Sequence, residues 1–354
     1  MTPQGMTGRH PLVVLESFPE PRPTTNPYLV QLKDSLPSDV SVRTFTWRNA
    51  LIGSYDVFHV HWPENLLRGS SRPRTLARRL AVAVMLARLS LLRIPVVRTL
   101  HNSSPHESGG TVERALLRWF DRLTAAWIRL SLSTLAPSDA PIVTIPHGHY
   151  RDWFVRVPRS AVEPGRIAFV GMLRPYKGVE DLVDAFHSLP DRDLRLRIAG
   201  RPMDPALHAR VTAAAHADDR IELRLEHLDD AGIADEVGRA ELVVLPYRKL
   251  ENSGVALLAL SLDRPVLLPR GTTAAELAAE VGEGWVTTYE GTVTGADLIR
   301  ALDEVRRADL IGPPDLSARE WPAAGEMHAT VLRGAVAVGR RGPAAPSKSG
   351  ARVE

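Results

Sequence analysis

The chain of 354 residues contains no cysteine, and only four of its 44 basic residues are lysine. The absence of cysteine excludes disulfides, thiolate nucleophiles and cysteine-ligated zinc or iron–sulfur sites, and it fits a reducing compartment. No uninterrupted apolar run reaches the roughly 18 to 20 residues of a membrane-spanning helix, and the amino terminus lacks the hydrophobic core of a signal peptide. From the sequence alone we therefore expect a cytoplasmic protein.

The basic residues are concentrated in the first half of the chain. Residues 1–150 carry 17 Lys/Arg against 10 Asp/Glu, although the net charge of the whole chain is only +3. Eight arginines from Arg68 to Arg98, and a second group from Arg114 to Arg129 beside Trp119 and Trp127, interleave with apolar residues, which predicts basic amphipathic helices. Two interpretations stay open: solvated faces of ordinary helices, or a patch that binds the anionic inner face of a membrane. No nucleic-acid-binding motif accompanies the charge, so we expect no nucleic-acid partner.

Short apolar runs alternate with helix-period segments twice along the chain. This alternation predicts an α/β fold with two doubly wound parallel sheets that face a cleft. We expect domains at residues 11–158 and 159–312, a helical segment at 313–339, and disordered ends at 1–10 and 340–354. The expected strands of the first domain lie at residues 11–18, 40–47, 55–62, 94–102, 132–138 and 140–148, and those of the second start at Arg166 and continue at 194–200, 220–227, 240–247 and 264–269.

Two loops of the second domain have the composition of an anion site. In the stretch from Phe169 to Phe186, a hydrophobic strand leads into Gly171, then Arg174 and Lys177, then an amphipathic helix. Lysine is rare in this chain, so its use here indicates a need for a compact point charge. The later loop 246–254 leads into another helix, whose first N–H groups favour an anion. The plainer alternative is a pair of exposed loops with incidental charges.

The order of these two loops resembles the nucleotide-sugar domain of GT-B glycosyltransferases, particularly the large retaining family four, whose domains are Rossmann-like. The resemblance implies that the donor diphosphate binds to Arg174 and Lys177 of the first loop and to the second loop, 246–254. It implies that Met172 and Ala259 depart from the family pattern, so the ribose ligand is unassigned. The residues that the resemblance gives to the donor diphosphate are Arg174, Lys177, Asn252, Ser253 and Gly254, with Glu251 as a candidate catalytic residue beside the donor sugar.

Further candidates follow from the ends of the strands, where ligands of such sheets bind. In the second domain these are Gly171, Gly200, His227 and Leu228, as contacts to the donor sugar or nucleotide. In the first domain, His101 closes a strand and is a candidate for a sugar-hydroxyl contact or for acid/base catalysis. His59 and His61 face the same way in one strand, but we expect no metal there because no carboxylate cluster accompanies them. The expected acceptor-side residues are Thr25, Asn26, His61 and His147, with Asn26 as a helix N-cap before Pro27.

The function predicted from these features is the transfer of a hexose from a nucleotide-diphosphate sugar to a lipid-linked or glycan acceptor. The strings HVHWP and PHGHY are similar to those of bacterial exopolysaccharide and glycolipid enzymes that often use GDP-mannose, so mannose is favoured. We expect no metal and no cofactor, because the cations and the helix N-terminus would stabilise the leaving diphosphate. The sequence Asp191-Arg192-Asp193 lies at the amino end of a strand, away from any ligand. Two alternatives stay open: an epimerase or hydrolase that uses Glu16, Glu64 and Glu251, and a silent partner of a polysaccharide-assembly complex.

Overall fold

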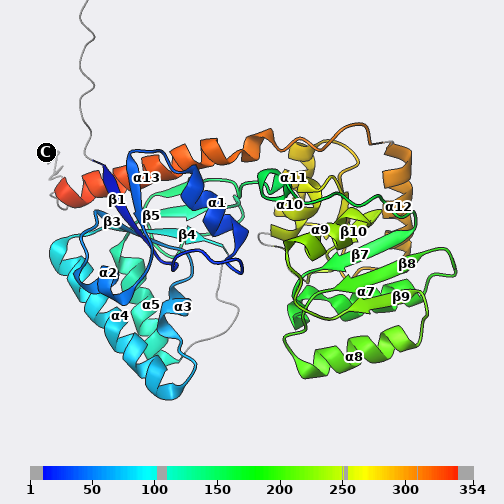
Figure 1. Cartoon of the computed structure of the whole chain (residues 1–354), viewed down its shortest axis with the longest axis horizontal. Coiled ribbons are helices and arrows are strands. Elements are labelled where there is room, and N and C mark those ends of the chain that lie inside the picture. The colour runs from blue at the N-terminus through cyan, green and yellow to red at the C-terminus, as the bar shows by residue number, and fades with distance from the viewer. Residues whose placement is uncertain (1–10, 102–109, 249, 251–253, 309, 342–354) are drawn as a thin grey trace, which may run out of the picture. The chain divides into compact units, whose positions relative to one another are not determined.

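The computed structural model describes residues 11–101, 110–248, 250, 254–308 and 310–341. The chain divides into two units, Met1–Pro146 with Trp321–Glu354 and His147–Glu320. Each unit contains one six-stranded sheet in which all paired strands are parallel (Figure 1). The predicted α/β fold with two doubly wound sheets is confirmed.

The sequence predicted a domain boundary after residue 158, whereas the structure divides the two units after Pro146. Tyr150 and Phe154 pack into the core of the second unit, which therefore begins at His147. The last helix returns to the first unit, where Trp321 and Leu332 are buried. The linker between the two sheets is thus part of the second unit.

The first unit has helices on both faces of its sheet, whose strand order is β2-β1-β3-β4-β5-β6. Successive residues of a strand point to opposite faces. Val14 accordingly packs with α1 and α13, whereas Leu15 packs with α4 and α5. The elements are β1 (Leu12–Glu16), α1 (Pro27–Ser35), β2 (Val40–Arg43), α2 (Trp47–Ile52), β3 (Val57–Val60), α3 (Pro63–Leu67), α4 (Arg72–Leu92), β4 (Val96–Leu100), α5 (Thr111–Leu123), β5 (Thr124–Arg129), β6 (Ile142–Thr144) and α13 (Trp321–Arg341).

The segment after α5 corrects part of the sequence interpretation. Trp127 and Arg129 do not belong to a basic amphipathic helix, because Thr124–Arg129 forms the buried strand β5. Trp127 is fully buried, and its indole N–H donates a hydrogen bond to Ser138. The strand expected at residues 132–138 is likewise absent, since this described segment is the loop between β5 and β6.

The second unit has the strand order β12-β11-β10-β7-β8-β9. From β7 the chain builds β8 and β9 on one side and then returns to place β10 on the other side. In open sheets of this kind, ligands bind at such a switch point, beyond the carboxyl ends of the strands. The elements are α6 (Arg151–Phe154), β7 (Arg166–Val170), the 3-10 turn η1 (Pro175–Lys177), α7 (Val179–His187), β8 (Arg195–Ala199), α8 (Pro205–His216), β9 (Ile221–Arg224), α9 (Asp230–Gly238), β10 (Leu242–Val244), α10 (Gly254–Ser261), β11 (Val266–Pro269), α11 (Thr272–Val281), β12 (Val286–Tyr289), α12 (Gly295–Ala308) and η2 (Ser317–Arg319).

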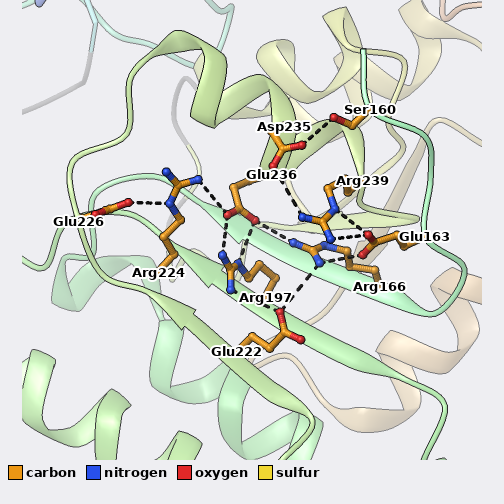
Figure 2. A network of polar contacts seen from close by, with 10 residues as sticks. All are labelled: Ser160, Glu163, Arg166, Arg197, Glu222, Arg224, Glu226, Asp235, Glu236 and Arg239. Atoms are coloured by element: carbon orange, nitrogen blue, oxygen red, sulfur yellow. Dashed lines mark hydrogen bonds and ion pairs between the residues drawn. The ribbon is translucent and has the colours of Figure 1, made fainter. Parts of the chain in front are cut away.

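A buried carboxylate joins α9 to three strands of this sheet (Figure 2). Glu236 is only 1% exposed and accepts hydrogen bonds from Arg166 on β7, Arg197 on β8 and Arg224 on β9. Burial by itself would raise the pKa of Glu236, but the three guanidinium groups bring it below its ordinary value. The network anchors α9 to the sheet. The loops of the candidate site lie elsewhere, at the carboxyl ends of β7 and β10.

Within the described part of the chain, no helix is both long enough and apolar enough to cross a membrane.

Candidate active site

Two glycines bring the loops after β7 and β8 into direct backbone contact. Gly171 has a φ of +133° and donates its N–H to the carbonyl of Ala199 at 2.9 Å. Gly200 has a φ of +139°, and a Cβ placed on it would lie 2.1 Å from the carbonyl oxygen of Gly171. Only glycine fits such a φ and such an approach. The predicted Gly171 and Gly200 therefore shape the loops at the switch point.

Lys177 is a buried cation at the end of the turn η1. Lys177 is only 8% exposed. Its Nζ lies 5.9 Å from the ring centre of Phe169 and 5.4 Å from that of Tyr247. Burial lowers the pKa of Lys177 to about 8, and the nearby charge of Arg174 lowers it further in the same direction. Among the described residues no carboxylate forms an ion pair with Lys177. A buried charge without a counter-charge is costly, so the site favours an anionic ligand.

The start of α10 lies at the same place. A Cβ on Gly171 would lie 3.3 Å from Lys177 Nζ and 3.7 Å from Val255, the second residue of α10. A Cβ on Gly254 would lie 3.1 Å from the hydroxyl of Tyr150. The structure thus brings together Gly171, Lys177 and the first turn of α10. The predicted Glu251, Asn252 and Ser253 lie outside the described residues.

The other predicted donor residues differ in their surroundings. Arg174 is half-buried and close enough to Lys177 for its charge to act on it. His227 is exposed after β9, whereas the side chain of Leu228 packs into the core of the unit.

His147 lies in the second unit, although the sequence placed it with the acceptor-side residues. Its Nε2 is 3.2 Å from the hydroxyl of Tyr150, which contacts the start of α10. Burial lowers the pKa of His147 to about 4, so the imidazole is neutral at pH 7. Sequence reasoning missed Tyr150, although it stands in the same PHGHY string.

The first unit contains a cluster of one carboxylate and three histidines at the carboxyl ends of its strands, and all but the half-buried His101 are buried. Glu16 ends β1, His59 lies in β3, His61 follows β3, and His101 follows β4. Glu16 is 0% exposed and its Oε1 accepts a hydrogen bond from His59 Nδ1 at 2.9 Å, while its Oε2 lies 3.3 Å from His61 Nε2. His61 Nδ1 is in turn 3.1 Å from His101 Nε2. The sequence predicted no carboxylate cluster beside the histidine pair, and the structure places one carboxylate, Glu16, next to both rings.

Electrostatics fix the charges in this cluster. Burial would raise the pKa of Glu16, but His59 and His61 bring it down to about 2, so the carboxylate is ionised. Burial lowers the pKa of His61 to about 4, so this ring is neutral at pH 7. One potential ligand atom from each of Glu16, His59 and His61 lies within 4.8 Å of the other two, a spacing at which three side chains could hold a metal ion. Hydrogen bonds with Glu16 and Thr99 already occupy both nitrogens of His59.

The predicted Thr25 and Asn26 are engaged in local hydrogen bonds. Asn26 is the N-cap of α1, with Oδ1 accepting from Tyr28 N at 3.0 Å and Pro27 following at the first helical position. The hydroxyl of Thr25 accepts from the backbone N–H of Arg22. Both residues shape the loop after β1.

Two parallel Rossmann-like sheets, with a buried cation at the switch point of the second, define the class of GT-B glycosyltransferases. Solved structures of similar fold include the Anabaena protein HepE in complex with UDP and glucose, with a TM-score of 0.60 and 16% identity over 91% of this chain and 100% of that one. Another is sucrose-phosphate synthase from Thermosynechococcus elongatus, with a TM-score of 0.59 and 14% identity over 92% and 99% of the two chains. They confirm the predicted fold.

Sequence comparison identifies the family. Residues 164–304 match the family model described as glycosyl transferases group 1. The chain is also 49% identical to a GDP-mannose:glycolipid 4-beta-D-mannosyltransferase of Xanthomonas campestris pv. campestris over 318 residues, which cover 90% of each protein. The chain belongs to the group 1 glycosyltransferases, and the prediction of a glycosyltransferase is confirmed.

Proposed function

We propose that the protein transfers mannose from GDP-mannose to a glycolipid. The observation that carries this proposal is the buried ammonium group of Lys177, which has no carboxylate partner among the described residues and lies beside Gly171 in the loop after β7. The choice of donor and acceptor follows the relative that is 49% identical to this chain over 318 residues.

In this proposal the donor diphosphate binds to Lys177, Arg174 and the first turn of α10 at Gly254, with Asn252 and Ser253 beside it. These groups stabilise the negative charge that develops as the sugar–phosphate bond breaks, so the reaction requires neither a metal nor a cofactor. Gly171, Gly200 and His227 border the sugar and the nucleotide. Glu251 would contact the transferred sugar, and Thr25, Asn26 and His61 would line the acceptor side near His101.

We further propose that the protein works as a peripheral enzyme at the cytoplasmic face of a membrane, in exopolysaccharide biosynthesis. Support comes from an exposed apolar ridge on α4, a helix that also carries five arginines. The residues of this ridge recur at spacings of four, four and seven and therefore share one helix face: Leu76, Leu80, Val84 and Leu91, with exposures of 60, 61, 60 and 83%.

Ligand-induced thermal shift tests the donor site. GDP-mannose and GDP should raise the melting temperature of the wild-type protein more than UDP-glucose does, and Lys177→Ala should abolish the rise while the protein still folds. Unchanged binding by Lys177→Ala would show that the diphosphate lies elsewhere. Stabilisation by none of these nucleotides would refute the proposed function itself.

Liposome flotation tests the membrane surface. The wild-type protein should float with vesicles that contain anionic phosphatidylglycerol at low salt, and the double variant Leu80→Glu/Val84→Glu should stay in solution. Ile311→Glu is the matched control, because Ile311 is an exposed apolar residue of the other unit, with an exposure of 92%. Equal flotation of all three proteins would contradict a role for the α4 ridge.

A further inference from the structure

Side chains of the types that bind metal ions meet inside the first unit, at the switch point of its sheet. In the order β2-β1-β3-β4-β5-β6, the chain leaves β1 toward β2 on one side and returns with β3 on the other. Glu16 is the last residue of β1, His59 lies within β3, and His61 directly follows β3. The cluster therefore stands where a sheet of this kind presents its ligand site.

Two atoms of this cluster are buried without a hydrogen bond. Glu16 Oε2 and His61 Nε2 lie 3.3 Å apart, in side chains that are 0% and 1% exposed. Within the part of the chain that the structure describes, neither atom has a hydrogen-bond partner. Buried polar atoms are nearly always satisfied by the protein, by water or by an ion. Two ligands of one tetrahedral zinc ion, each about 2.0 to 2.2 Å from the metal, are themselves roughly 3.3 to 3.5 Å apart. One ion can therefore contact both atoms at the observed separation.

Both imidazoles have one nitrogen toward Glu16 and the other toward a second polar group. His59 Nδ1 lies 2.9 Å from Glu16 Oε1, and its Nε2 lies 2.8 Å from the hydroxyl of Thr99. His61 Nδ1 lies 3.1 Å from His101 Nε2. Histidines that bind a metal are oriented in this way, because the nitrogen that faces away from the metal makes a hydrogen bond to an outer partner. An N–H donated from His59 Nε2 to Thr99 leaves the lone pair of His59 on Nδ1, beside Glu16.

His328 of α13 adds another unpaired nitrogen near the cluster. Its ring centre lies 5.9 Å from that of His59. Its Nδ1 donates to the carbonyl of Ala324 at 2.7 Å, so its lone pair is on Nε2. This Nε2 is buried and has no hydrogen-bond partner among the described residues. A nitrogen of this kind can accept a hydrogen bond from a water, and water is the usual fourth ligand of a zinc ion to which a protein gives three.

The ligand types select the kind of ion. Two imidazoles and one carboxylate suit Zn²⁺ and its neighbours among the transition metals, whereas Mg²⁺ and Ca²⁺ prefer sets of oxygen ligands. We infer that Glu16, His59 and His61 bind one divalent transition-metal ion of the zinc class. On binding, His59 gives up its hydrogen bond to Glu16 and keeps the one to Thr99. The ion links the end of β1 to β3 and neutralises a fully buried carboxylate.

This inference goes beyond the proposed function and does not depend on it. The proposed donor site at Lys177 belongs to the second unit and needs no metal. The prediction of no metal at His59 and His61 relied on the lack of accompanying carboxylates, and the structure supplies one in Glu16.

Metal binding is measured on the full-length protein without an affinity tag. Elemental analysis of protein purified without chelators should find a stoichiometric amount of zinc or of a neighbouring transition metal. After removal of the metal, titration with Zn²⁺ against a competing chelator gives the dissociation constant. Glu16→Gln keeps the shape of the side chain but removes the charged ligand, so it should weaken Zn²⁺ binding by more than about 100-fold. Thr99→Val removes only the outer partner of His59 and should weaken binding by about 10- to 100-fold.

Another group of possible ligands provides the matched control. In the second unit, one ligand atom from each of His149, Asp152 and Glu320 lies within 4.8 Å of the other two, and both carboxylates are exposed. The double variant Asp152→Asn/Glu320→Gln should bind Zn²⁺ as tightly as the wild-type protein. Circular dichroism of each metal-free variant shows whether it is folded.

Three results would overturn the inference. The first is a wild-type protein that binds Zn²⁺ no more tightly than Glu16→Gln. The second is loss of Zn²⁺ binding in Asp152→Asn/Glu320→Gln, which would place the ion at the other group. The third is an unchanged Zn²⁺ affinity in Thr99→Val, which decides the matter even if Glu16→Gln does not fold. Absence of GDP-mannose binding would instead refute the proposed function, and stoichiometric Zn²⁺ lost in Glu16→Gln would then still support the metal site.

Discussion

Replacement of Lys177 by methionine should stabilise the ligand-free protein and abolish donor binding at the same time. The pKa of Lys177 lies at about 8, lowered from 10.5 mainly by burial. A difference of about 2.5 pKa units corresponds to roughly 3 kcal/mol of destabilisation of the charged form. Because the pKa is lowered on folding, this cost is fully present below pH 8, decreases as the pH rises from 8 to 10.5, and is absent above 10.5. Methionine has a similar length and carries no charge.

Urea unfolding of the ligand-free proteins at pH 7 measures the gain. With a slope of about 3 kcal/mol per molar urea, the midpoint of the second unit should rise by about 1 M in Lys177→Met. The gain should vanish near pH 10.5, where the wild-type lysine is neutral. Lys33→Met is the control: Lys33 is a surface lysine paired with Glu20 at 3.0 Å, so its loss should cost less than about 1 kcal/mol. A lower midpoint for Lys177→Met, or equal affinity of both proteins for GDP, would refute the argument that this buried charge is kept for an anion.

Two further predictions concern pH and stability. The dissociation constant for GDP should rise about tenfold from pH 7 to pH 9, as Lys177 loses its proton with a pKa of about 8, and titration calorimetry of Lys177→Arg should show no such dependence. Glu236→Gln should lower the free energy of unfolding by about 1.5 to 3 kcal/mol in urea, because it removes the buried carboxylate that three guanidinium groups share. Glu226→Gln at an exposed ion pair should change it by less than about 1 kcal/mol.

The sequence was most informative where a feature is local. A hydrophobic strand, Gly171, Lys177 and an amphipathic helix follow one another directly, so the anion-binding corner could be found from spacing alone. The pairing of Glu16 with His59 joins residues 43 positions apart, and only the order of the strands brings them together. Strand β5 was mistaken for helix because arginines and aromatic residues continue through it from α5 without a glycine or proline to mark the boundary.

Two buried charges, Glu16 in the first unit and Lys177 in the second, are surrounded in opposite ways. Glu16 is fully buried, yet His59 hydrogen-bonds to one of its oxygens and His61 Nε2 lies 3.3 Å from the other, so neighbouring side chains offset part of the cost of burying this carboxylate. Lys177 is buried against aromatic rings and a neighbouring cation, without a carboxylate partner among the described residues. A compensated charge can orient its neighbours without changing its own state, whereas an uncompensated charge gains free energy only when an anion arrives. The cluster at Glu16 is therefore suited to hold its side chains in a fixed arrangement, and the corner at Lys177 is suited to bind and then stabilise a leaving diphosphate.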